Sequence, residues 1–409
     1  MTQATILVPA SRRIEFFLLL SGYFFYMLRY GTNNDAIVLN LGALQILVAI
    51  YAFMRYGVPA RVLSFFGIFF LGLFVAQFMY LAVVHDSGLP GSDSEYLYAS
   101  TRLLVYLLFM CLHGLTIRPV DVQGLVRAVL YLSRFSAVIG LASILLYAAI
   151  GVPVLLHFYG GDMVVRVQAF LSEPSAFAPI IGILLIWGCY WRSPKDIVLG
   201  ISVMLISYSP VAIIGGCASF VIYTFFFRKG RHVLNASMIV FFAVVFYYLM
   251  NLDCVSLADS SSVLFKVFGR TSCGLQAVFD PALGPGANQR LWSMLTSIDL
   301  LQHKGAMLTG FGLNSSSIFM PELYGDMREN SLWVSILLFY GVFGVFVFGG
   351  LCVWGFVRLR AVKEMAVVFV SFLVGSTINS AGGFYLHALV FWMMAYVFSS
   401  QSRARVALS

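Results

Sequence analysis

The sequence has little charge, because only 10% of its 409 residues are Asp, Glu, Lys or Arg. Soluble globular chains carry about 25% charged and 45–50% apolar residues, whereas this chain is 61% hydrophobic with a mean hydropathy of +0.92. A chain of this size cannot bury so much apolar surface within itself. This excludes a soluble enzyme, a DNA-binding protein and a disordered chain. The formal charge of +8 needs no nucleic-acid partner, because cytoplasmic loops of membrane proteins collect Lys and Arg.

Cysteine and histidine are also scarce, with six residues of each. They form no HxxxH or CxxC arrangement, so the sequence predicts no metal site and no cofactor. The first residues lack the small-residue cleavage site of a signal peptide, and we expect the first helix to remain as an anchor. Cys254 and Cys273 share a polar segment and could form a disulfide if that segment faces an oxidising compartment.

Long apolar runs dominate the sequence instead. A spanning helix needs about 20 mostly apolar residues, with a range of about 17–25. We therefore predict an all-α polytopic membrane protein, a single membrane domain over residues 1–409 with about 12 spanning helices. The predicted spans are Ile14–Met27, Ala36–Met54, Val62–Val84, Leu97–Ile117, Phe135–Ile150, Ser175–Trp191, Ile197–Tyr208, Val211–Phe227, Val233–Met250, Ser331–Val357, Met365–Thr377 and Leu386–Ser399.

Charge sets the predicted orientation. With the N-terminus inside, the inner loops and tails hold 16 basic residues and four acids, whereas the outer side holds eight basic residues and 13 acids. This bias predicts cytoplasmic termini and two long periplasmic loops, residues 151–174 and 251–330. The amphipathic segment Gln123–Arg134 fits an interfacial helix or the foot of a long tilted span, and we favour the interfacial helix.

Both outer loops carry charged residues next to predicted spans. The first loop contains Arg166 and ends in Glu173-Pro174-Ser175, where a helix start favours the carboxylate. The second has apolar residues at helical spacing, which predict an amphipathic helix near 290–303 with Arg290 at its start. A Gly310-Phe-Gly312 turn follows, and Arg328-Glu329-Asn330-Ser331 opens the next span. Each motif is open to a structural reading, as a helix cap or an ordinary turn.

Together these segments resemble the O-antigen ligase/polymerase (Wzy) superfamily. The resemblance rests on Arg166 to Ser175, the Arg290-led helix, Gly310–Gly312 and the Glu329–Asn330 pair. Ligases of this superfamily typically have His where this chain has Glu329, which favours a polymerase. The resemblance implies a GT-C type helical glycosyltransferase without a metal ion. It also implies undecaprenyl-pyrophosphate-linked oligosaccharides as donor and acceptor, at the periplasmic face of a bacterial inner membrane.

The resemblance and the chemistry together suggest a site. As the glycosidic bond breaks, negative charge grows on the lipid pyrophosphate, and arginine binds phosphate bidentately while staying charged. In this hypothesis, the pyrophosphate is bound by Arg166, Arg290 and Arg328, with Arg270 as a secondary fourth ligand. Glu173 or Glu329 acts as the base or orients the acceptor. The sugars are contacted by Asn330, Tyr324 and Gln168. His387 flanks the last outer turn and could serve the chemistry, although a lone histidine near a helix mouth is more often structural.

Two rival functions share parts of this pattern. A ligase that moves finished glycan onto lipid A core would use the same donor and the same arginines. A transporter or flippase of lipid-linked oligosaccharides would place polar residues near the midplane, whereas here they gather on the outer side. A polymerase would also have the bilayer and a chain-length regulator as partners.

Overall fold

The computed structural model describes most of the helical part of the chain. The described residues are 9–25, 27–30, 37–58, 63–64, 67–68, 71–72, 75, 93–118, 120–151, 155–159, 164–167, 171, 176–207, 209–227, 236, 240, 243–244, 247–248, 250–258, 269, 272–273, 276, 289–312, 331–359 and 362–378. The predicted span Leu386–Ser399 and most of Val62–Val84 and Val233–Met250 lie outside these residues.

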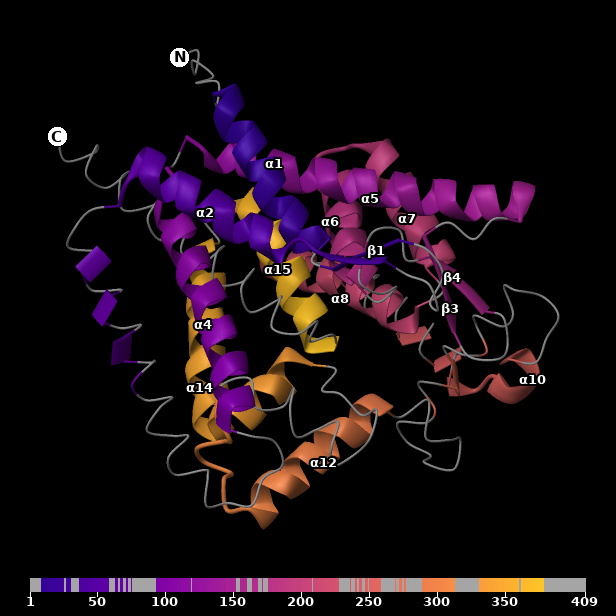
Figure 1. Ribbon diagram of the computed structural model, residues 1–409. Helices are drawn as coiled ribbons and strands as arrows, with labels where there is room; N and C mark the ends of the chain where they lie inside the picture. Colours follow the sequence, from indigo (N-terminus) through magenta and orange to yellow (C-terminus); the bar gives the residue numbers. More distant parts are fainter. Residues whose placement is uncertain are drawn as a thin grey trace.

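The described part is predominantly helical (Figure 1). Its helices are α1 (Ala10–Phe24), α2 (Gly42–Tyr56), α4 (Asp93–Leu115), α5 (Val122–Ile150), α6 (Phe177–Tyr190), α7 (Pro194–Ile206), α8 (Pro210–Phe227), α10 (Cys254–Ala258), α12 (Gln289–His303), α14 (Leu332–Leu359) and α15 (Lys363–Ile378). By length and composition, α5 and α14 could each cross a membrane. The helical part of the prediction is confirmed, and the two candidate spans are consistent with a helical membrane protein; the count of about 12 spans and the GT-C arrangement stay predictions.

Two short antiparallel hairpins join the helices, which the all-α prediction did not include. β1 (Met27–Tyr30) pairs with β2 (Ile37–Asn40), and β3 (Leu156–Tyr159) pairs with β4 (Val164–Val167). The first hairpin shortens two predicted spans, since α1 ends at Phe24 and α2 begins only at Gly42. A strand is favourable at the predicted start of the second span, because Ile37 and Val38 are β-branched residues, which suit a strand better than a helix.

Helix α5 corrects the interpretation of Gln123–Arg134. The structure joins this segment to the following apolar run in one helix of 29 residues, so the prediction of a separate interfacial helix is wrong. The apolar face of this segment is buried, since Leu125, Val129 and Leu132 belong to the main hydrophobic core. The helix ends at Gly151, whose positive φ of 70° is the left-handed conformation common at helix C-termini.

The centre of the bundle is α6, which packs against α7, α8 and α15. Small residues allow the close approach: a Cβ on Gly182 would lie 2.7 Å from the Cβ of Ser219 and 2.9 Å from the Oγ of Ser371. Helix association in membranes depends on such close packing, because lipid gives apolar side chains no reason to leave it. The α7–α8 connection is a tight turn in which Ser209 Oγ accepts a hydrogen bond from the amide of Ala212.

Helix α14 is broken within its apolar run. Tyr340 and Gly341 have non-helical dihedral angles, with φ of +63° at Gly341. The turn that follows α12 fills the break: the amides of Phe311 and Gly312 donate to the carbonyls of Leu338 and Phe339 at 2.7 and 2.9 Å. In return, the amide of Val342 donates to the carbonyl of Met307 at 2.9 Å. Irregular backbone at membrane depth is tolerated where protein satisfies it in this way.

This interlock requires glycine on both sides. Gly310 has a φ of +70°, and a Cβ there would lie 2.5 Å from the carbonyl carbon of Phe339. A Cβ on Gly341 would collide with the backbone of Leu308. The Gly310-Phe-Gly312 motif is therefore part of a contact between the predicted outer loop and α14, and not only a turn.

We predict that Gly310→Ala detaches the turn and destabilises the protein by about 1–3 kcal/mol, the usual cost of overpacking. Gly305→Ala is the matched control, since Gly305 has a similar φ of +66° but nothing within 4 Å of its added Cβ. Thermal unfolding of the purified protein in detergent measures both. Equal losses for the two variants would contradict the interlock and leave backbone strain as the only effect.

Candidate functional site

Helix α12, in the predicted outer loop, is attached to α4 and α14 through its C-terminal half. Leu300 and Leu301 of α12 and Phe311 of the turn share a hydrophobic cluster with α4 and α14. The α4 and α14 members of this cluster are Leu103, Leu104, Val334, Leu338 and Phe339. Figure 1 shows α12 at the bottom of the view, at the opposite end of the bundle from the start of α1. We call α12 and the turn through Gly312 the outer arm.

Of the ten predicted site residues, the structure places the backbone of two. Arg290 is the second residue of α12, and Arg166 lies in β4, where it pairs with His157 of β3. The other eight lie outside the described residues: Glu173, Glu329, Arg270, Arg328, Asn330, Tyr324, Gln168 and His387. The convergence of the arginines on one diphosphate therefore stays a prediction. Among the described side chains, no group of three or more His, Cys, Asp and Glu residues could hold a metal ion.

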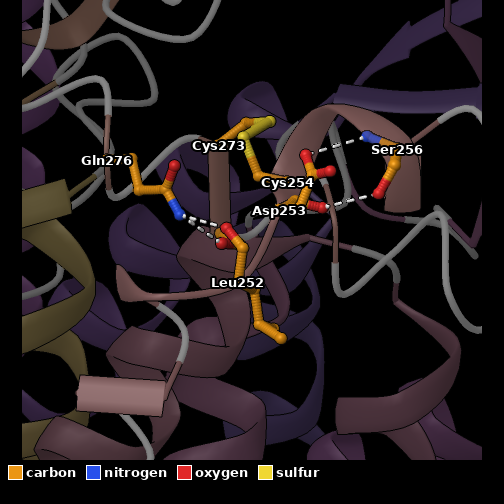
Figure 2. The surroundings of a disulfide bond; sticks show 7 residues. Leu252, Asp253, Cys254, Ser256, Cys273 and Gln276 are labelled. Carbon is orange, nitrogen blue, oxygen red and sulfur yellow. Dashed lines mark hydrogen bonds between the residues drawn. A yellow bond between two sulfur atoms is a disulfide. The ribbon is translucent and has the colours of Figure 1, made fainter.

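A disulfide joins Cys254 to Cys273 in the large predicted loop. Figure 2 shows its surroundings, in which Gln276 Nε2 donates to the carbonyl of Leu252 at 2.8 Å. Asp253 precedes α10, and its Oδ1 accepts the amide of Ser256 at 3.3 Å. Disulfides persist in oxidising compartments and are rare in the cytosol. The pairing therefore favours the predicted placement of this loop on the outer side.

Among the described residues, the largest group of buried charges lies at the other end of the bundle, where α1 begins. The Arg12 guanidinium is fully buried, and its Nη1 donates to Glu15 Oε1 at 2.5 Å. Its Nη2 donates to the carbonyl of Thr116 at 2.8 Å, at the C-terminal end of α4. The Nε2 of His113, also on α4, lies 2.7 Å from the same Glu15 oxygen. One guanidinium thus connects α1 to the end of α4.

Asp121 completes this group, which we call the inner ionic network. Its Oδ2 lies 3.4 Å from Arg12 Nε and accepts both the amide and the Nε of Arg118, each at 3.1 Å. Asp121 is the residue before α5, but its carboxylate turns back to these arginines instead of capping the helix. The ring of Tyr56 covers the Arg12 guanidinium at 3.8 Å, a cation–π contact that adds α2 to the network.

The inner ionic network is suited to holding helices together. Two arginines face two carboxylates, so the group is neutral when His113 is neutral. Both terminal nitrogens of Arg12 already donate to protein oxygens, and buried pairs of this kind need all their partners. The sequence shows only the Arg12–Glu15 spacing of three residues, which suits a helix-surface pair. It gives no sign of partners about 100 residues away on α4 and before α5.

A second ion pair connects α5 to α7. Arg134 donates to both carboxylate oxygens of Asp196, with Nε–Oδ1 at 2.6 Å and Nη2–Oδ2 at 2.7 Å. Burial alone would raise the pKa of Asp196, but hydrogen bonds from Arg134 and Ser193 outweigh it and lower the pKa below its ordinary value. The carboxylate is therefore charged at neutral pH, and this part of the stability is lost only as the pH falls through the lowered pKa.

Comparison with known proteins adds no assignment, since no family model and no curated protein matches this chain. The site must therefore be judged on the geometry and chemistry of its own residues.

We predict that Glu15→Gln destabilises the protein by about 3–5 kcal/mol, the cost of removing one partner from a buried ion pair. The matched control is Asp299→Asn in α12, where an exposed carboxylate lies 3.7 Å from His303. Exposed pairs of this type contribute only about 0.3–0.5 kcal/mol. Denaturant unfolding in detergent compares the two variants, and similar losses would show that the inner ionic network does not hold the bundle.

We also predict that Cys254 and Cys273 resist maleimide labelling in intact protein until a reductant is added. In Cys254→Ser the partner thiol is freed, and Cys273 should then react without reductant. Mass spectrometry of the labelled peptides gives the result. Labelling of both cysteines in the untreated wild-type protein would show that the loop does not carry the disulfide and would remove its support for an outer location.

Proposed function

We propose that this chain is a membrane-embedded glycosyltransferase with about 12 spans in a GT-C type arrangement. It joins oligosaccharide repeat units carried on undecaprenyl pyrophosphate into O-antigen or a related surface polysaccharide. The reaction takes place at the periplasmic face of a bacterial inner membrane. The resemblance of the outer-loop motifs to the O-antigen ligase/polymerase superfamily suggests this function, and the placement of the outer arm supports it.

The observation that carries the proposal is the attachment of Arg290's helix to the outer half of α14. Arg290 lies in the first turn of α12, whose other end packs on Val334 and Leu338. Arg290 thus belongs to a helix that is attached to the start of α14, as the proposal requires if this helix contributes to an anion site.

The proposed chemistry uses only groups of this chain. The donor's leaving group is a lipid diphosphate, and fixed guanidinium groups stabilise the charge that develops on it. The acceptor hydroxyl needs a carboxylate to take its proton, and Glu173 or Glu329 fills this role in the proposal. The new glycosidic bond forms as the bond to the diphosphate breaks, and the proton leaves with the base.

A transporter remains the rival from another class, because broken helices such as α14 are typical of transporter binding sites. In those sites the freed backbone groups coordinate the cargo. Here the carbonyls of Leu338 and Phe339 already accept amides from the Gly310–Gly312 turn. The break is therefore engaged with the outer arm, which favours a site at the outer surface over one at the midplane.

We predict that Arg290→Ala and Arg166→Ala each lower polymer formation by about 10²–10³-fold, the usual loss on removing one preorganised donor. Arg290→Lys should also be poor, since lysine lacks the bidentate geometry. Arg55→Ala, which removes an exposed arginine near the end of α2, is the control. The assay is polymer length from purified lipid-linked repeat units at matched protein levels. Full-length polymer from both Arg166→Ala and Arg290→Ala would overturn the proposal.

The product formed in cells distinguishes the polymerase from the ligase. Loss of a polymerase leaves single repeat units on the lipid A core, whereas loss of a ligase leaves the core bare. We expect the first pattern for a deletion of this gene and for Arg290→Ala.

A further inference from the structure

Helix α4 presents one arginine on its exposed face. Arg102 lies near the start of the apolar stretch Ser100–Leu115, and its side chain is exposed. Tyr98, one turn before it, is 68% exposed, and Val105, one turn after it, is 36% exposed. The Arg102 guanidinium carbon lies 5.8 Å from the centroid of the Tyr98 ring. Among the residues that the structure describes, no carboxylate pairs with it.

The neighbours of Arg102 indicate its depth. The next two residues, Leu103 and Leu104, pack with Val334 and Leu338, which lie in the first two turns of α14. At 1.5 Å per residue, these positions are within about 10 Å of the start of that span. In the predicted orientation, Arg102 is therefore near the outer end of the span, from which a long arginine side chain can reach the headgroups. A guanidinium there, bordered by apolar and aromatic side chains, is complementary to a phosphate attached to a lipid.

The position of Arg102 on α4 connects it with the outer arm. Leu103 and Leu104 share their cluster with Leu300 and Leu301 of α12, so the helix that exposes Arg102 also holds the arm that carries Arg290. We propose that Arg102 is the docking point for the diphosphate headgroup of a polyprenyl carrier lipid, which approaches from the bilayer along α4. This inference rests on the proposed function for the identity of the lipid. It adds a residue that binds the lipid before the reaction.

The test measures lipid binding without turnover. Full-length protein in phosphatidylcholine nanodiscs is titrated with undecaprenyl diphosphate, and with phosphatidylglycerol and inorganic diphosphate in separate arms. Arg102→Gln should bind undecaprenyl diphosphate about tenfold more weakly, the loss typical of one charge-assisted hydrogen-bonded pair. Arg102→Lys should fall between Arg102→Gln and the wild type. Arg55→Gln, which removes an exposed arginine from α2, should bind as the wild type does. Because Arg102 is exposed, unfolding temperatures should be unchanged, which verifies that each variant is folded.

Each other outcome has a definite meaning. Equal affinities of Arg102→Gln and Arg55→Gln for undecaprenyl diphosphate would overturn the inference. An equal loss of affinity for phosphatidylglycerol would also overturn it, because the surface would then bind any anionic lipid. Equal loss for inorganic diphosphate would overturn the lipid assignment and show a site for the free anion. Failure of the proposed function is distinguishable, since the wild-type protein would then make no polymer while Arg102 still governed carrier binding.

Discussion

The burial of the Arg12 guanidinium is the constraint on which the described bundle depends. A charge removed from water is tolerated only where its donors meet acceptors, and those acceptors come from α1, from the end of α4 and from the residue before α5. Arg12 therefore reaches all of its acceptors only where α1, α4 and the start of α5 lie together. Tyr56 brings α2 into the same arrangement by covering the guanidinium. Ion pairs hold the helices together at this end of the bundle, whereas in the main core small residues allow α6, α8 and α15 to pack closely.

The two ends of the bundle are built on different principles. At the end where α1 begins, Arg12, Glu15 and Asp121 are buried together, while Arg118 pairs with Asp121 from an exposed position. At the end that carries α12, the described arginines lie on an exposed helix face or in a helix attached to α14 through apolar contacts. The disulfide in the same loop agrees with an oxidising environment on that side. Buried charge thus contributes to cohesion at the end where α1 begins.

The sequence predicts the broad class and many helix positions, because apolar runs of spanning length occur mainly in helices that cross a bilayer. It fails where long-range contacts decide. By position Asp121 and Asp196 look like loop charges and Glu15 like part of a helix-surface pair, yet all three are buried and paired with arginines. The polar face of Gln123–Arg134 suggests an interface, although the segment continues into the following run. The break at Tyr340–Gly341 has no local signal, since its stability comes from a turn about 30 residues earlier. Of the candidate site, the sequence indicates residue types and their chemistry, but not which side chains meet.

The contact between the Gly310 turn and the break in α14 limits which segments can be exchanged with those of another protein. Loops between helices are natural units to exchange when chimeric proteins are made. If the Gly310 turn of this chain were replaced by an unrelated loop while α14 was kept, the carbonyls of Leu338 and Phe339 would lose the amides of residues 311 and 312. A donor loop lacking glycine at position 310 could not seat against Gly341 at all. The loop and the helix should therefore be exchanged together. The crossover points of a folded chimera should lie outside residues 307–342.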